Sequence, residues 1–276
     1  MKILSERVGE DFEGRLIKDF LRIKLSLSMT LIKKVKFGGV SVNGEVVTMR
    51  KLLSAGDLVE VRLPKEDSEF VTPVNEPLTV LYEDEYILLV DKPINMPTHP
   101  SKYNSLVTLA NLVRAYVGEE FVFRAITRLD RDTSGIVLIA KDQISADALS
   151  REMKEGKIEK TYTAILQSTP SESSGIIDAP IEREAPDSIK RIVREDGKSA
   201  VTKYKVTELL PDGRAVCEVT PITGRTHQIR VHMAYIGCPL ENDFLYGNRG
   251  EGTYSLRCTA LSFIHPKTNK KITVKA

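Results

Sequence analysis

Hydrophobic positions in the first sixty residues follow two different spacings. Apolar side chains recur at helical spacing over residues 12–21 and again over residues 29–36, which predicts two amphipathic helices. Residues 40–47 instead alternate apolar and polar side chains around Asn43-Gly44, a pair typical of a tight hairpin turn. The predicted order is helix, helix, hairpin and a last strand, in a compact unit that ends near residue 63.

Residues 64–77 interrupt both patterns, because they combine three prolines and four acidic residues without sustained periodicity, as expected of a linker. Beyond them, strands are predicted at residues 79–82, 86–91, 135–140, 160–166, 201–209, 214–220, 254–264 and 271–274, and helices at 107–117 and 145–156. We therefore expect an α+β protein in two parts. A small module of residues 1–63 precedes a large domain of residues 78–276, built on a mixed, mostly antiparallel sheet with flanking helices.

Composition narrows the class of protein. The apolar runs are far shorter than the roughly 20 residues that cross a bilayer, so we expect no membrane span. Acidic Glu6 precedes any apolar signal region, which favours a cytoplasmic location. Cys217, Cys238 and Cys258 fit neither a disulfide framework nor paired zinc ligands, and we expect them to be buried free thiols.

Positive charge is concentrated in the small module. The whole chain carries only +2, but residues 15–51 contain nine Lys and Arg against two acidic residues. Such density is the electrostatic footprint of a surface that meets phosphates. A merely solvated basic face would have the same composition.

The module resembles a known RNA-binding unit. A basic second helix followed by Gly39-Val40-Ser41-Val42-Asn43-Gly44 is similar to the module named after ribosomal small-subunit protein four, and the likeness covers most of residues 3–63. Such modules lay a basic helix along RNA. The resemblance implies that Lys33, Lys34 and Lys36 contact phosphates.

A polar cluster precedes one predicted strand of the large domain. Residues 127–135 contain two carboxylates, Asp130 and Asp132, and two arginines, directly before an apolar run. Loops beside rigid strands often carry reactive groups, although charged residues before a strand can also form an ordinary polar turn with no catalytic role. From these residues alone, either Asp130 or Asp132 could be the reactive carboxylate.

A second polar cluster covers residues 223–232. A helix through it would separate Arg225 and Arg230 by about 140°, so at most one of them should face a given carboxylate. His227 and His232 lack the spacing and the acidic neighbour of a zinc-protease helix, and we expect no metal site.

These clusters belong to a longer pattern. Arg128-Leu129-Asp130 followed by Thr133-Ser134-Gly135 resembles the signature of the RluA-type pseudouridine synthases. Further segments agree with that family in order: Val90-Asp91-Lys92-Pro93, His99-Pro100, Lys160–Ala164, Gly197–Thr202, Thr223–His232, Pro239-Leu240, Asp243, Tyr246-Gly247 and His265-Pro266. The resemblance spans roughly residues 78–276, and members that carry the N-terminal module are familiar.

The chain departs from the family pattern at four positions. Thr127 and Arg257 stand where histidine is common, and Asn95 and Asn242 replace common glycines. These changes affect loops and flanks, so they bear on target choice rather than on the reaction type.

The resemblance implies an RNA isomerase that needs no cofactor. Asp130 would be the nucleophile, and Arg230 would pair with it and favour its charged form. Tyr162 would stack on the target base and could help to remove its C5 proton, while Arg128 would fill the space left by the flipped nucleotide. Whether Asp130 attacks the sugar or the base stays open.

Two other functions fit parts of the sequence. A noncatalytic RNA-binding or ribosome-assembly factor would need the module, but retention of Asp130, Tyr162 and Arg230 together argues against it. A carboxylate-based hydrolase of nucleosides or glycans needs a second carboxylate at a defined separation, which Asp132 does not obviously supply. Family members with this module often modify large-subunit ribosomal RNA, so we expect that target ahead of transfer RNA, and a monomeric enzyme.

Overall fold

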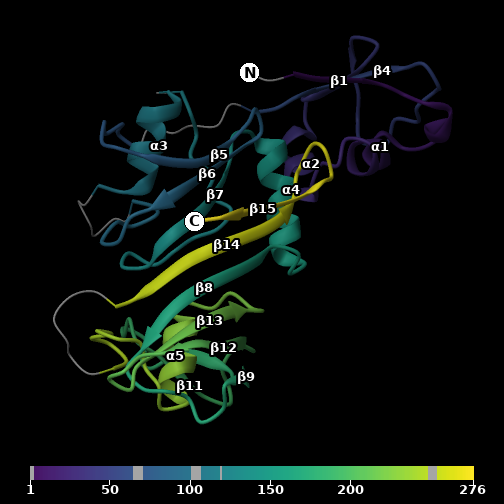
Figure 1. Cartoon of the computed structure of the whole chain (residues 1–276). Helices are drawn as coiled ribbons and strands as arrows, with labels where there is room; N and C mark the ends of the chain where they lie inside the picture. Colours follow the sequence, from purple (N-terminus) through teal and green to yellow (C-terminus); the bar gives the residue numbers. More distant parts are fainter. Residues whose placement is uncertain (1–2, 65–70, 101–106, 119, 248–253) are drawn as a thin grey trace.

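The computed structural model describes residues 3–64, 71–100, 107–118, 120–247 and 254–276. The described residues form a small four-stranded sheet near the N-terminus and a nine-stranded sheet in the remainder (Figure 1). A two-stranded ribbon lies beside the large sheet.

The small sheet is antiparallel throughout, with strand order β1-β4-β2-β3. Its elements are β1 (Ile3–Arg7), a 3₁₀ turn (Glu10–Phe12), α1 (Ile17–Ile23), α2 (Met29–Val35), β2 (Val40–Val42), β3 (Glu45–Val46) and β4 (Leu58–Arg62). Asn43 and Gly44 have φ of 51° and 87°, the left-handed conformation that a two-residue hairpin requires. The helix-helix-hairpin order is confirmed.

The predicted first helix has the wrong bounds. Residues 10–12 form a separate turn, and the chain bends at Gly14, where φ is 66°. Phe12 nevertheless packs edge-on against Phe20 with ring centroids 5.1 Å apart. The helical spacing therefore identified the buried side chains correctly, although they belong to two elements, the 3₁₀ turn and α1. Strand β1 was not predicted.

The large sheet has strand order β5-β6-β7-β14-β8-β13-β12-β9, with β15 paired to β14. Its strands are β5 (Thr79–Glu83), β6 (Ile87–Lys92), β7 (Ser134–Ala140), β8 (Glu159–Leu166), β9 (Ser174–Asp178), β12 (Val201–Leu209), β13 (Ala215–Pro221), β14 (Leu256–Ile264) and β15 (Lys271–Lys275). Every pair is antiparallel except β7 with β14. The mostly antiparallel α+β architecture is confirmed.

Three helices and the ribbon complete the large domain. They are α3 (Leu109–Val117), α4 (Gln143–Lys154), α5 (Gln228–Tyr235), β10 (Ile181–Arg183) and β11 (Arg191–Val193). Strands β6 and β7 lie in the centre of the core, where residues 87–90 and 136–140 are fully buried. Burial on both faces explains why these strands read as continuous apolar runs.

The parallel contact between β7 and β14 positions the loop that carries Asp130. Gly135 pairs with Cys258 and has φ of 110°. A Cβ at position 135 would collide with the backbone of Cys258, so only glycine lets the two strands approach here. The loop before β7 is thereby held beside β14 and its neighbour β8.

Helix α4 of the large domain lies beside α2 of the small module (Figure 1). Its Asp147 accepts a hydrogen bond of 2.5 Å from the backbone N–H of Ser28, at the start of α2. One turn later, Arg151 donates a 2.7 Å hydrogen bond to the carbonyl of Ser26. The helix ends at Lys154, so one element reaches from the module towards the sheet.

Two composition-based expectations can be compared with the structure. Cys217, Cys238 and Cys258 are buried free thiols, as predicted. In the described part of the chain, no helix has the length and apolar character needed to cross a membrane.

Candidate active site

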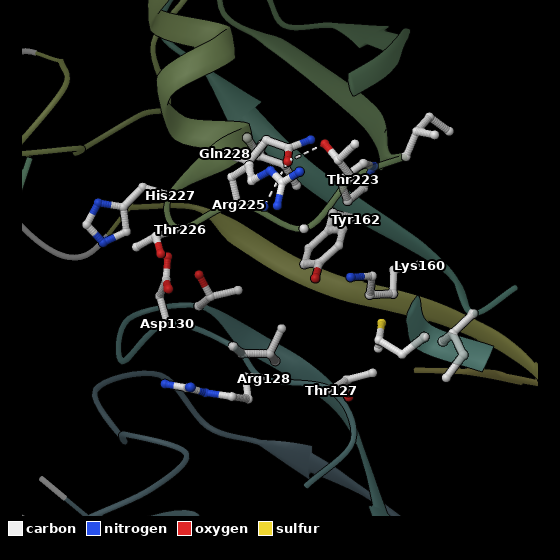
Figure 2. Close-up of a pocket in the computed structure, with 18 of the residues that line it drawn as sticks. Thr127, Arg128, Asp130, Lys160, Tyr162, Thr223, Arg225, Thr226, His227 and Gln228 are labelled. Atoms are coloured by element: carbon white, nitrogen blue, oxygen red, sulfur yellow. Dashed lines mark hydrogen bonds between the residues drawn. The ribbon is translucent and has the colours of Figure 1, made fainter. Parts of the chain in front are cut away.

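A cavity of about 650 Å³ lies where the two polar clusters of the sequence meet (Figure 2). One wall is the loop before β7, and the opposite wall is the segment of residues 221–230 that leads into α5. Strand β8 and the end of α4 complete it. Segments almost one hundred residues apart in the sequence thus share one site.

Asp130 lies half-buried on the first wall. Its carbonyl accepts the Thr133 N–H at 3.2 Å, which closes a turn and directs the side chain into the cavity. Figure 2 shows the carboxylate pointing towards Thr226 and His227. Among the described residues, no side chain forms a hydrogen bond or ion pair with this carboxylate, so it can meet a ligand.

Asp132 has a different environment. Its side chain is 8% exposed and accepts two hydrogen bonds from the Arg131 guanidinium, at 2.7 and 2.9 Å. It does not belong to the cavity wall. The two carboxylates that the sequence left equivalent are therefore distinguished by burial and pairing.

Buried Lys92 supports the loop from below. Its ammonium donates hydrogen bonds to the carbonyls of Pro93, Met96 and Arg131, at 2.8, 2.7 and 3.0 Å. Burial lowers the pKa of Lys92 to about 8, although the nearby aspartates, Asp132 first, oppose this shift. Lys92 ties the strand β6 side of the core to the loop that carries Asp130.

Arg230 projects from α5 into the opposite wall and forms a buried ion pair with Asp243. Its Nε and terminal nitrogen each donate a 2.7 Å hydrogen bond to the carboxylate, and the two side chains are 4% and 0% exposed. The Tyr254 ring centroid lies 4.2 Å from the guanidinium carbon. Burial is the largest single influence and by itself lowers the pKa of Arg230. The hydrogen bonds to Asp243, together with the charge interactions with Tyr254, Asp243 and Asp130, raise the pKa overall.

The predicted pairing of Arg230 with Asp130 differs from these contacts. Within the described residues, the hydrogen bonds of Arg230 go to Asp243, and Asp130 acts on the guanidinium only through its charge. Two hydrogen bonds to one carboxylate fix the orientation of a planar guanidinium. Arg230 therefore presents a fixed positive charge to the cavity.

Tyr162 forms the floor of the cavity on β8 and is 7% exposed. It pairs with Val219 of β13 on one side and Cys258 of β14 on the other, which fixes its position in the centre of the sheet. Burial raises the pKa of Tyr162 well above its ordinary value. The phenol is therefore neutral at physiological pH.

Gln228 organises the turn before α5. Its amide oxygen accepts the Thr223 hydroxyl at 2.7 Å and the Arg225 N–H at 2.9 Å (Figure 2). Its amide nitrogen donates to the backbone carbonyl of Val201 and the hydroxyl of Thr202, both at 2.9 Å. The turn is therefore tied to strand β12 as well as to the helix.

The expected angle between Arg225 and Arg230 was wrong, because the helix begins only at Gln228. His227 precedes it in a left-handed conformation with φ of 57°, and its Nδ1 lies 2.7 Å from the Tyr246 hydroxyl. Arg225 sits in the turn, and both arginines reach the cavity wall.

The remaining predicted RNA-binding residues are exposed. Arg128 lies on the cavity wall beside Asp130. Lys33 and Lys34 lie in the last turn of α2, and Lys36 follows the helix. The Lys36 amine is 4.9 Å from the centroid of the Phe37 ring, and Phe37 is 85% exposed. The structure brings Arg128, but not these three lysines, to the cavity.

The departures from the family pattern have local structural explanations. Asn95 and Asn242 have φ of 58° and 57°, a conformation that glycine adopts freely and asparagine tolerates. Arg257 pairs with Asp91 through two hydrogen bonds of 3.0 and 2.7 Å. The Thr127 hydroxyl accepts the Leu138 N–H at 2.9 Å. Each position thus keeps a structural role without the usual residue.

The sequence assigned no role to several residues of the site, namely Lys92, Lys160, Gln228, Asp243 and Tyr254. Asp243 belonged to the family pattern, but nothing local linked it to Arg230. Tyr254 hydrogen-bonds to Thr133 at 3.1 Å across 121 residues. The part of the chain that the structure describes contains no group of three His, Cys, Asp or Glu side chains arranged to hold a metal ion.

Comparisons with known proteins agree on one reaction. Residues 86–235 match the model of the family described as RNA pseudouridylate synthase. Uncharacterized RNA pseudouridine synthase YjbO of Bacillus subtilis (strain 168) is 39% identical, with 90% of each chain covered. Ribosomal large subunit pseudouridine synthase D of Xanthomonas campestris pv. campestris is 34% identical, with 95% of this chain and 83% of that protein covered. The solved structure of Human RNA Pseudouridylate Synthase Domain Containing 1 has a TM-score of 0.62 and 26% identity, with 73% of this chain and 83% of that chain covered.

Proposed function

Because this chain belongs to the RluA-type family of RNA pseudouridine synthases, we propose that it isomerises a specific uridine of large-subunit ribosomal RNA with Asp130 as the nucleophile. Relatives named as ribosomal large subunit synthases, at 33% and 34% identity, support the choice of target. Such a target implies a cytoplasmic protein, and transfer RNA is the alternative substrate.

One observation carries the assignment of Asp130. It is the only carboxylate among the described residues that line the cavity. Isomerisation requires the N1–C1′ bond of uridine to break, the base to turn, and C5 to join C1′. A carboxylate that is free of side-chain partners among the described residues can supply the nucleophile for this rearrangement.

The other groups of the cavity support this chemistry. Arg230, fixed by Asp243, places a positive charge where it stabilises the carboxylate of Asp130. Tyr162 offers a flat, buried ring on which the flipped base can stack. Because its pKa is raised, Tyr162 has no phenolate at neutral pH, and we assign it stacking rather than removal of the C5 proton.

Arg128 and the basic module would hold the RNA. Arg128 is exposed beside Asp130, where it can occupy the space that the target nucleotide leaves. Lys33, Lys34 and Lys36 are exposed on the module and can meet phosphates. Helix α4 keeps the module in contact with the domain that contains the cavity.

A hydrolase mechanism with two carboxylates has less support. Asp132 is buried and paired with Arg131, so a second carboxylate is missing from the cavity wall among the described residues. A noncatalytic role would leave the arrangement of Asp130, Tyr162 and Arg230 in one cavity without a purpose.

The proposal is tested by mapping pseudouridine at nucleotide resolution. Ribosomal and transfer RNA are taken from cells that lack the protein, and from the same cells complemented with wild type or Asp130→Ala. We expect one ribosomal site to disappear and to return only with wild type. A missing site in transfer RNA would replace the target, and an unchanged map in both RNAs would contradict the proposal.

A further inference from the structure

Lys160 lies beside Tyr162 in the cavity but has no assigned role. The two residues are separated by one position on β8, and side chains two apart in a strand point to the same face. Both line the cavity, and Figure 2 shows the Lys160 amine on the same side of the strand as the Tyr162 ring. A base stacked on Tyr162 would therefore meet Lys160 at its edge.

Lys160 also differs from two other lysines of this domain that are shielded from solvent. Lys92 has three carbonyl acceptors, and Lys141 pairs with Glu83 at 2.9 Å. Among the described residues, no carboxylate pairs with Lys160 and no acceptor takes a hydrogen bond from its amine. A half-buried cation without a partner is costly, which points to a ligand that supplies the negative charge.

The neighbouring groups do not supply this charge. Burial lowers the pKa of Lys160, and the nearby thiol of Cys258 is neutral because burial raises its pKa to about 12. The amine lies close to Gly224 of the opposite wall, where an added Cβ would be 3.9 Å from Nζ, and both residues line the cavity. The Lys160 amine therefore lies at the part of the cavity that the target base would fill.

The other cations of the cavity are differently engaged. Arg230 is held by Asp243, and Arg225 donates from Nε to the carbonyl of Ser199 at 2.9 Å. Arg128 is exposed. Lys160 is thus the cation placed to reach the edge of a base on Tyr162.

We propose that Lys160 is a catalytic residue whose ammonium donates a hydrogen bond to a carbonyl oxygen of the target uracil and stabilises the negative charge that develops on the base. This inference rests on the proposed function. When the N1–C1′ bond breaks, its electron pair stays with the base and is shared among N1, O2, O4 and C5. Asp130 bonds to C1′ as the base departs. The C5–C1′ bond then forms from the electron pair of the base while the Asp130–C1′ bond breaks and returns its pair to the carboxylate. C5 loses its proton to water and N1 gains one, so no oxidant or reductant is needed.

The test compares Lys160→Met, Lys160→Arg and a matched surface control, Lys271→Met. Lys271 is 57% exposed and pairs with Glu159 on the outside of the same strand. For each protein, the affinity for a large-subunit ribosomal RNA transcript and the single-turnover rate at saturating protein are measured. An inactive wild type would contradict the proposed function itself, whatever the variants do.

With an active wild type, we expect Lys160→Met to lower the single-turnover rate about a hundredfold, as for loss of one donor to a developing anion, with unchanged RNA affinity. Lys160→Arg keeps a cation and should retain a larger share of the rate. Lys271→Met should match wild type. Because the pKa of Lys160 is lowered, the wild-type rate should fall with rising pH earlier than the rate of Lys160→Arg, whose guanidinium stays charged.

A transcript containing 5-fluorouridine separates charge stabilisation from a structural effect. Fluorine withdraws electrons and makes the departing base a weaker base, so less help from Lys160 is needed. The rate defect of Lys160→Met, measured as loss of 5-fluorouridine from the transcript, should therefore be smaller than the defect on the uridine transcript. Lys160→Gln serves the same comparison if Lys160→Met does not fold.

Three results would overturn the inference. A wild-type rate in Lys160→Met would mean that the residue has no role in the reaction. A defect confined to RNA affinity would assign Lys160 to a phosphate contact. Equal inactivity of Lys160→Arg and Lys160→Met, with a wild-type rate that rises with pH, would make the neutral amine a base instead.

Discussion

The cavity and the basic face of the module use charge in opposite ways. In and under the cavity wall, Arg230 and Lys92 are buried and fixed by several hydrogen bonds. On the module, Lys33, Lys34 and Lys36 are exposed. Buried, oriented charges act strongly on a reacting group and are little affected by salt, whereas exposed charges attract phosphates and are screened. We therefore expect the cavity to determine the rate of the reaction and the module to contribute to RNA affinity.

Breaking the ion pair behind the cavity should have the largest effect on stability. Asp243→Ala leaves the Arg230 guanidinium buried without its partner, at a cost of about 3–5 kcal/mol in the free energy of unfolding. The rate of pseudouridine formation should also fall, because Arg230 loses its orientation. Urea denaturation and a single-turnover assay measure the two effects.

The control for this change is Asp212→Ala. Asp212 pairs with Arg214 at the surface, where the side chains are 53% and 36% exposed, so its loss should change the free energy of unfolding far less than the loss of Asp243. Equal costs for the two substitutions would mean that the Asp243 pair is not buried in solution.

Buried Lys92 predicts a pH dependence of stability. Its folded pKa of about 8 lies below the ordinary 10.5, so above pH 8 the unfolded chain binds more protons than the folded chain. The contribution of Lys92 to stability should therefore increase as pH rises, by about 2 kcal/mol between pH 8 and pH 10.

Lys92→Met removes this titration. The free energy of unfolding is measured in urea at a series of pH values for both proteins. The value for wild type minus the value for Lys92→Met should increase from about pH 8 to about pH 10. A difference that is constant with pH would contradict a buried, titrating lysine under the loop.

The smallest effect on the chemical step is expected from the module. Replacing Lys33, Lys34 and Lys36 together by alanine should weaken RNA binding and leave the saturated single-turnover rate unchanged. The slope of log affinity against log salt should become shallower by about 0.7–0.9 for each phosphate that the module no longer neutralises. Filter binding at several salt concentrations measures this slope, and an unchanged slope would remove these lysines from the RNA-binding surface.

Much of the fold could be predicted because local patterns determine it. The runs in β6 and β7 are continuous and apolar since both faces are buried, and Asn43-Gly44 fixes its own hairpin. Strands β9, β10 and β11 were missed because segments of three to five residues give no usable periodicity. The start of α5 was missed because the Gln228 side chain makes a turn there through contacts with β12.

The candidate site was predictable only through resemblance to the family, because its residues come from distant segments. The resemblance named Asp130, Tyr162 and Arg230, and all three line one cavity, on its two walls and its floor. The pairing of Arg230 with Asp243 depends on a loop that follows α5, and the burial of Asp132 depends on packing. Neither leaves a signal in the spacing of residues.

The central claim is that Asp130, and not Asp132, carries the reaction. The most direct measurement is pseudouridine formation by Asp130→Asn and Asp132→Asn on one large-subunit ribosomal RNA transcript, with RNA affinity measured alongside. We predict no product from Asp130→Asn despite wild-type affinity, and measurable product from Asp132→Asn. Product from Asp130→Asn, or loss of product from Asp132→Asn alone, would contradict this claim.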